Sequence, residues 1–321
     1  MNKPFVVPVN RDSACQPPSA KDFLVDRTFR GLARIGVVLI LALVAALVFE
    51  VGRKALPGME KHGFDVLFGS VWDVNQGKYG ILPAIWGTLY SAFIALLIAG
   101  FFGVSMAIFL TQDFLPAKLA AVFRTIVELL AAIPSVVYGL WGIYVVIPAI
   151  RPLTTWLNSE LGWIPFFGTS LSGPGLLPAA LVLAIMILPT IAAVSQDALT
   201  SVPMKTKQAA YGMGTTHWEA ILKVMVPSAA TGIFGSLVLG LGRALGETMA
   251  LAMLVGNANN ISLSLFAPAN TLAALLALNF PEARPNEVEV LMYAALVLMF
   301  ITLLVNVIGS MIMLYAQRGN R

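Results

Sequence analysis

Six long stretches of the chain are almost entirely apolar, and more polar segments separate them. Crossing the hydrocarbon core of a bilayer, roughly 30 Å thick, takes about 20 residues of helix. None of the stretches alternates strictly between apolar and polar residues as a half-buried strand would, so helices are predicted. The pattern predicts an all-α, polytopic membrane protein with six transmembrane helices, at approximately Ile35–Val51, Leu82–Leu110, Leu119–Ile150, Leu176–Val194, Ser228–Gly256 and Val288–Leu314.

The composition excludes a water-soluble domain. Of the 321 residues, 58% are hydrophobic and only 11% are charged, which leaves too few polar side chains to cover a soluble surface. The first apolar stretch begins too far from the N-terminus for a cleaved signal peptide, so a retained anchor helix is expected. The single cysteine, Cys15, excludes an internal disulfide and a cysteine-based metal site. His62 and His217 fall in separate predicted loops, and no metal or cofactor is predicted.

The distribution of positive charge predicts the orientation of the chain. Lys and Arg are about twice as frequent in the segment before the first apolar stretch, and in the other segments on that side, as in the loops on the opposite side. Cytoplasmic segments carry such an excess. Both termini are therefore expected in the cytoplasm.

Two opposite charges, Arg243 and Glu247, lie four residues apart inside the fifth apolar stretch, in LGLGRALGETMALAM. An ionised side chain at the centre of a lipid-exposed helix costs on the order of 2.5–3.5 kcal/mol on insertion scales, so an interior or water-lined position is expected. Residues four apart share one helix face, where the two charges would partly neutralise each other. Small residues also recur four apart, a spacing that lets another helix approach closely: Gly232, Ser236, Gly240, Gly242 and Gly246.

The charged pair fits either a structural ion pair that locks two spans together or an anion site on a transport path. The planar donor fork of arginine matches a tetrahedral oxyanion and does not deprotonate. Phosphate near neutral pH keeps a proton that Glu247 could accept, whereas sulfate has none. We therefore interpret Arg243 as an anion contact and Glu247 as its partner or a proton acceptor. Ser135, beside Pro134, is a further candidate for lining the path, and the alternative is a hydroxyl bonded to its own helix.

The segment between the fourth and fifth stretches, SVPMKTKQAAYGMGTTHWEAILKVMVPSA, is amphipathic and mildly basic. Pro203 is placed to start a short helix, and Pro227 is placed to introduce the fifth span. Gly212 and Gly214 divide two short helical patterns. Such a segment can lie on the membrane surface, or it can present a short helix with a glycine turn to a cytoplasmic partner.

This loop resembles the one carried by permease subunits of bacterial ABC importers, which has the form EAA, three residues, Gly, nine residues and I-x-L-P. The chain has Gln208-Ala209-Ala210, Gly214 and Val224-Met225-Val226-Pro227 at that spacing, with Gln208 in place of the glutamate. Within that superfamily the chain is similar to the C-type permeases of phosphate importers, and the similarity covers almost everything after about residue 80, plus the anchor helix. The segments that carry it are GTLYSAFIAL, AAIPSVVYGLWG, ILPTIAAVSQDAL and GRALGETMALAMLVGN.

The resemblance implies a three-part organisation. Residues 1–34 would be a cytoplasmic N-terminal tail, and residues 35–80 would hold the anchor helix and the first periplasmic loop. Residues 81–321 would form a five-helix, MetI-like permease core that includes a cytoplasmic coupling loop at 200–228. The site residues assigned to ATPase coupling are Lys205, Gln208, Ala209, Ala210, Gly214 and Pro227, and those assigned to the substrate pathway are Arg243, Glu247 and Ser135.

The resemblance also implies the partners and the location. They are a homologous A-type permease, two copies of a cytoplasmic ATP-binding subunit, a periplasmic phosphate-binding protein, phosphate and membrane lipid, without nucleic acid, in the bacterial inner membrane. The chain has no G-x-x-x-x-G-K-[ST] loop, so it is expected to be a transport subunit and not an enzyme.

Three other functions stay open at this point. A permease for molybdate, sulfate or phosphonate would use similar charges. A gradient-driven transporter or anion channel would have no reason to carry the coupling loop at importer spacing. A membrane-embedded enzyme that uses Glu247 would need a constellation with a second carboxylate, a histidine or a nucleophile, and the predicted spans hold no such constellation.

Overall fold

The computed structural model describes residues 20–112 and 114–319. The chain divides into two compact units, one ending at Arg53 and the other beginning at Lys54. In the first unit the described residues form the greater part of helix α1 (Ala20–His62). Its most apolar window has no residue buried inside the protein. A helix that exposes apolar side chains on every face suits a lipid environment, as expected for an anchor.

The end of α1 differs from the predicted loop after Val51, because the helix continues to His62. Its last turns belong to the second unit, where Ala55 is fully buried and Met59 packs in an apolar cluster with Val290. Lys61 Nζ also lies 2.6 Å from the carboxylate of Glu289 on helix α13. Hydropathy predicts that the span ends where polar residues begin, whereas these tertiary contacts stabilise the helix beyond that point.

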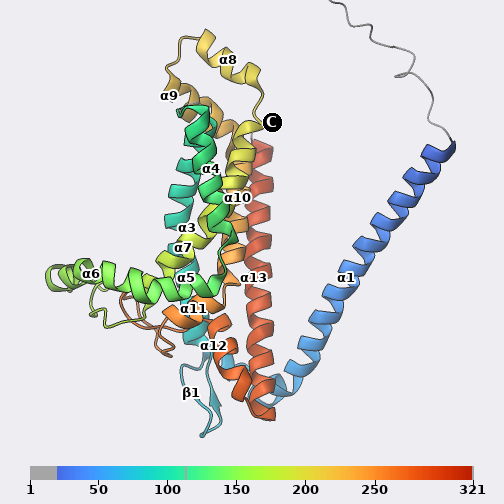
Figure 1. Cartoon of the computed structure of the whole chain (residues 1–321). Helices are drawn as coiled ribbons and strands as arrows, with labels where there is room; N and C mark the ends of the chain where they lie inside the picture. Colours follow the sequence, from blue (N-terminus) through green and yellow to red (C-terminus); the bar gives the residue numbers. More distant parts are fainter. Residues whose placement is uncertain (1–19, 113, 320–321) are drawn as a thin grey trace, which may run out of the picture. The chain divides into compact units, whose positions relative to one another are not determined.

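The second unit is a bundle built around three helices that contact one another, α3 (Leu82–Thr111), α7 (Leu176–Thr200) and α10 (Val226–Leu245). A fourth long helix, α13 (Pro285–Gly319), packs against α10. Figure 1 shows these four helices side by side. The core between them is made of small and aliphatic side chains, including Ala92, Ala95, Ala99, Leu183, Ile187 and Ile191.

Small residues on α10 allow its close contact with α7, as predicted. A Cβ atom at Gly232 would overlap the Cβ of Ala198, and one at Gly240 would lie 2.7 Å from the side chain of Ile191. Between these glycines, Ser236 Oγ and Ser195 Oγ form a buried hydrogen bond of 2.8 Å. The contact therefore combines steric fit with a satisfied polar pair.

We expect Gly232→Ala to destabilise the bundle by about 1–3 kcal/mol, because the added methyl group has no space against Ala198. The matched control is Gly235→Ala on the same helix, where the new Cβ would meet only the far end of Met313 at 3.7 Å. The melting temperature of the detergent-solubilised protein measures both. Equal melting temperatures for the two variants would contradict this account of the contact.

The third predicted span, Leu119–Ile150, is wrong as a single helix. The chain forms α4 (Ala117–Ala132), then α5 (Ser135–Trp141), a π-helical turn (Gly142–Val146) and α6 (Ile147–Leu161). Pro134 causes the break, since it has no N–H and drives the preceding Ile133 into an extended conformation. The segment long and apolar enough to cross a membrane is Ser135–Leu161. Figure 1 shows α4 lying along the bundle and α6 leading away sideways.

The fifth predicted span, Ser228–Gly256, is also wrong in its bounds. The helix begins with α9 (His217–Glu219) and a π-helical turn (Ala220–Met225), continues into α10 and ends at Leu245. Pro227 is the second residue of α10 and lies inside the continuous helix, so it does not introduce the span as predicted. A separate helix, α11 (Met249–Leu254), comes next. Within the described residues, six helices are candidate membrane spans, which agrees with the predicted number.

The remaining elements are short and lie at the two ends of the second unit. Helix α2 (Asp65–Phe68) precedes a two-stranded antiparallel hairpin of β1 (Trp72–Asp73) and β2 (Lys78–Tyr79). Helix α12 (Leu272–Asn279) and a 3-10 turn (Phe280–Glu282) precede α13. Helix α8 (Met204–Gly212) lies at the other end of the unit from the hairpin (Figure 1).

Candidate functional site

Arg243 is near the end of α10, and its side chain reaches α7. Its Nη1 donates a hydrogen bond of 2.9 Å to Thr190 Oγ1. Arg243 is exposed at the surface of the chain and Thr190 is partly exposed. The guanidinium is therefore not sealed in dry protein, and a solute or a second subunit has access to it.

Glu247 does not share a helix face with Arg243, so the predicted neutralisation by helical spacing is wrong. α10 ends at Leu245 with Gly246 as its C-cap, and the backbone turns before α11. Glycine has a low helix propensity, which favours an end at this point. The carboxylate Oε1 of Glu247 instead accepts a hydrogen bond of 3.3 Å from the backbone N–H of Ala250 in α11.

Within the described part of the chain, the charge on Arg243 is consequently not compensated. Among the residues that the structure describes, no carboxylate forms an ion pair with Arg243, and Thr190 is its only recorded hydrogen-bond partner. A guanidinium has five N–H donors, so most of its donors remain available to a ligand.

Ser135 is the first residue of α5, directly after the break at Pro134. Its side chain is partly exposed, and no hydrogen bond of its hydroxyl is recorded in the described part of the chain. The next turn of α5 packs on α11, where Gly139 faces Ala250 and Met253. Ser135 thus lies on a helix that contacts the segment after Glu247, but no recorded bond joins it to Arg243 or Glu247.

The predicted coupling loop forms a short helix, a glycine turn and a capped second helix. Gly214 has φ +82°, a left-handed conformation that side chains disfavour. Thr216 then caps α9 through a capping box with Glu219: its hydroxyl accepts from the Glu219 N–H, and the Glu219 carboxylate accepts from the Thr216 N–H. Pro203 is the N-cap residue of α8, close to the predicted start.

Most of the residues assigned to ATPase coupling are exposed. They are Lys205, Gln208, Ala209, Gly214 and Pro227. Ala210 is the exception, at 1% exposure, and it anchors the inner side of α8. Met204 and Met213 are 64% and 77% exposed at the two ends of α8, which leaves an apolar surface for a partner.

An aromatic cluster connects this loop to the α3–α4 connection. The ring of Phe114 lies 4.9 Å from that of His217 and 4.8 Å from that of Trp218. Tyr211 on α8 stacks on His217 at 6.3 Å. The cluster therefore joins α8 to α9, which leads into α10, and to the segment before α4.

The family model described as "Binding-protein-dependent transport system inner membrane component" matches residues 99–321. The chain is 38% identical, over 93% of its length and 93% of the relative's, to the phosphate transport system permease protein PstC of Xylella fastidiosa strain Temecula1. It is 36% identical to the probable phosphate transport system permease protein PstC of Methanocaldococcus jannaschii, over 80% of this chain and 83% of that one.

The chain belongs to the PstC permease family. As a member of this family it is a multi-pass inner membrane component of a binding-protein-dependent transport system. It is a transport subunit and not an enzyme, and its partners include a binding protein and an ATP-hydrolysing subunit.

Solved structures agree with this fold. A chain of a bacterial alginate ABC transporter, crystallised with a periplasmic protein, matches with a TM-score of 0.60 at 16% identity, over 90% of this chain and 94% of that one. A chain of the inward-facing MetNI methionine transporter matches with a TM-score of 0.54 at 20% identity, over 74% and 95%. These likenesses support the importer permease fold of this PstC-family chain.

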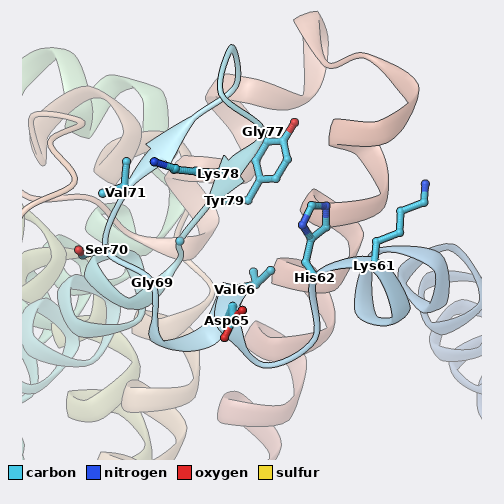
Figure 2. Close-up of a pocket in the computed structure, with 11 residues that line it drawn as sticks. Lys61, His62, Asp65, Val66, Gly69, Ser70, Val71, Gly77, Lys78 and Tyr79 are labelled. Carbon is cyan, nitrogen blue, oxygen red and sulfur yellow. The ribbon is translucent and has the colours of Figure 1, made fainter.

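At the end opposite α8, this PstC-family chain has an open cleft of about 370 Å³ beside the hairpin. Figure 2 shows His62 between Lys61 and Tyr79 at its edge, and the His62 and Tyr79 rings meet edge to face at 5.3 Å.

Burial, and after it the negative charge of Glu287, raises the pKa of Tyr79. The phenol therefore stays protonated at neutral pH. No metal-binding group of three or more acidic, His or Cys residues lies among the described residues.

Thr190 is the site residue that the sequence analysis did not nominate. It lies in ILPTIAAVSQDAL, directly after Pro189 in the interior of α7. A proline beside a hydroxyl residue within a long apolar stretch was the available signal. The partner, however, is 53 residues away in sequence, which no local pattern indicates.

Proposed function

We propose that the chain is the C-type permease of an ATP-driven importer of inorganic phosphate, and that it forms the translocation pathway with a homologous A-type permease. The observation that carries the proposal is the uncompensated guanidinium of Arg243, exposed between membrane helices of a PstC-family chain. A fixed positive charge with free donors suits a tetrahedral anion.

Three side chains are assigned to the pathway. Arg243 contacts the anion. Glu247 is the partner of Arg243 at the anion or the acceptor for the proton that phosphate carries, through a hydrogen bond, since in the described part of the chain only its Oε1 is engaged, by the Ala250 N–H. Ser135 lines the path at the break between α4 and α5, where its hydroxyl has no recorded partner in the described chain.

The loop at 200–228 transmits the work of the ATPase. The exposed methionines of α8 and the exposed Lys205, Gln208, Ala209 and Gly214 form its contact surface. Closure of two ATP-binding subunits would push α8, and the rings of Tyr211, His217 and Phe114 would pass that displacement on to α10 and α4. The pathway would then open to one side of the membrane at a time.

Both termini lie in the cytoplasm in this proposal. The end of α13 and α8 are at the same end of the second unit (Figure 1), and an even number of spans returns the N-terminus to that side. Residues 1–34 are assigned to the cytoplasmic side, although 20–34 already belong to α1 and residues 1–19 lie outside the described part of the chain. Residues 35–80 hold the rest of the anchor helix and the periplasmic loop, and 81–321 form the permease core. The phosphate-binding protein docks at the opposite end, beside the hairpin, and membrane lipid surrounds the spans.

The test is reconstitution of the chain with its A-type permease, two ATP-binding subunits and binding protein in proteoliposomes. We expect ATP hydrolysis to rise when phosphate-loaded binding protein is added. We also expect this only when ATP is on the same side of the membrane as α8. That side is identified with an impermeant thiol reagent, which labels Met213→Cys in a Cys15→Ser background. If only sulfate- or molybdate-loaded binding protein stimulated hydrolysis, the transported anion would be that oxyanion and not phosphate. Anion transport by the lone chain without nucleotide would refute the importer.

A further inference from the structure

The hydroxyl of Thr190 differs from those of other helical threonines in where it bonds. The hydroxyls of Thr111, Thr125 and Thr302 each donate to a carbonyl four residues back in their own helix, at 2.8–3.1 Å. The Thr190 hydroxyl instead accepts from Arg243 on another helix, at 2.9 Å. In the described part of the chain no acceptor is recorded for its own hydrogen.

A hydroxyl has one donor and two acceptor positions. Since the guanidinium of Arg243 occupies an acceptor position of Thr190, the hydroxyl hydrogen is available to a third group. A hydrogen bond received from a cation also polarises the O–H bond and makes it a better donor. The pair is thus equipped to donate from both side chains to one acceptor.

The location of the pair allows such an acceptor to reach it. α7 is the most enclosed of the candidate spans, with 61% of its apolar window buried. Thr190 is a polar residue at a point where this helix does reach the surface, and Arg243 beside it is exposed. The pair therefore faces outward from the bundle, toward the region that a second permease would enclose.

We infer that Thr190 is a second anion-contacting residue, which orients the guanidinium of Arg243 and donates its own hydroxyl hydrogen to an oxygen of the passing phosphate. This inference rests on the proposed phosphate pathway. The donors come from two helices, so the two-point site exists only while α7 and α10 hold their present relation. A displacement of either helix during the transport cycle would separate the donors and release the anion.

The inference is tested in the complete reconstituted complex with Thr190→Val, which keeps the shape of the side chain and removes the hydroxyl. We expect phosphate uptake to fall about 10- to 100-fold, the range for losing a hydrogen bond to a charged group. Binding-protein-stimulated ATP hydrolysis should persist, because α8 is unchanged. Thr190→Ser should restore uptake. The matched control is Thr302→Val, another partly exposed membrane threonine, whose hydroxyl serves only Leu298 and whose loss should leave uptake unchanged.

Normal uptake by Thr190→Val would overturn the inference. An equal loss in Thr190→Ser would also overturn it, because the hydroxyl would then not matter. So would an equal loss in the control Thr302→Val. If Thr190→Val does not assemble, uptake by Thr190→Ala, whose side chain is smaller than that of threonine, is compared with uptake by Thr190→Ser instead. A wild-type complex that moves no phosphate would refute the proposed function itself. That outcome is distinguishable, because it does not depend on any variant.

Discussion

Phosphate uptake by the reconstituted complex should fall at least about 100-fold in Arg243→Gln, the scale for removing one partner of a desolvated charge contact. The anion would lose the fixed positive charge of Arg243. The contact between α7 and α10 should survive, because the buried Ser195–Ser236 hydrogen bond and the close approach at Gly232 and Gly240 do not involve Arg243. The measurement is uptake of radiolabelled phosphate per assembled complex, together with copurification of the partner subunits.

The matched control for Arg243→Gln is Arg30→Gln. Arg30 lies on α1, its side chain is 69% exposed, and it pairs at 2.7 Å with Asp26 of the same helix. The substitution removes the same charge at a surface position and should leave uptake unchanged, because an exposed ion pair contributes little. If Arg243→Gln imports phosphate at the wild-type rate, Arg243 is a structural residue and the proposed anion contact is wrong.

Gly214→Val should reduce binding-protein-stimulated ATP hydrolysis about tenfold in the same complex. A left-handed conformation costs an L-residue roughly 1–2 kcal/mol, and a β-branched side chain makes it less accessible still. With φ +82° at this position, the turn between α8 and the Thr216 cap cannot form without strain. α8 would then no longer be held against the ATPase, while the membrane spans would remain intact.

Gly212→Ala, two residues earlier, separates this effect from a general sensitivity of the loop. Gly212 is the last residue of α8, it lacks a positive φ, and an added Cβ would meet nothing within 4 Å. We expect wild-type hydrolysis for it. Equal behaviour of Gly212→Ala and Gly214→Val would show that the left-handed turn has no part in coupling.

The predicted spans agree with the structure where apolar length alone determines the helix. The second span, the fourth and the last were predicted within a few residues, apart from the C-terminal end of α7, which runs to Thr200. The errors occur where a helix ends inside an apolar stretch, at Pro134 and Gly246, or continues into a polar one, as α1 does to His62. Hydropathy records transfer from water to lipid and does not detect a local backbone break.

The candidate site shows the same division. Arg243 is conspicuous in the sequence because a charge in an apolar stretch is costly and therefore informative. The pairing with Glu247 assumed an unbroken helix, and Gly246 ends that helix between the two residues. Thr190 gave no comparable signal, since a threonine is inexpensive in a membrane helix when it can bond to its own backbone.

By itself, the sequence determined that this is a six-span membrane protein with an importer loop and a charge within an apolar stretch. Apolar length, glycine and proline placement and charge are properties of single segments. Only the tertiary structure decided what Arg243 contacts. A hydrogen bond across 53 residues depends on how α7 and α10 pack, and that packing results from Gly232, Ser236 and Gly240 meeting their counterparts on another helix.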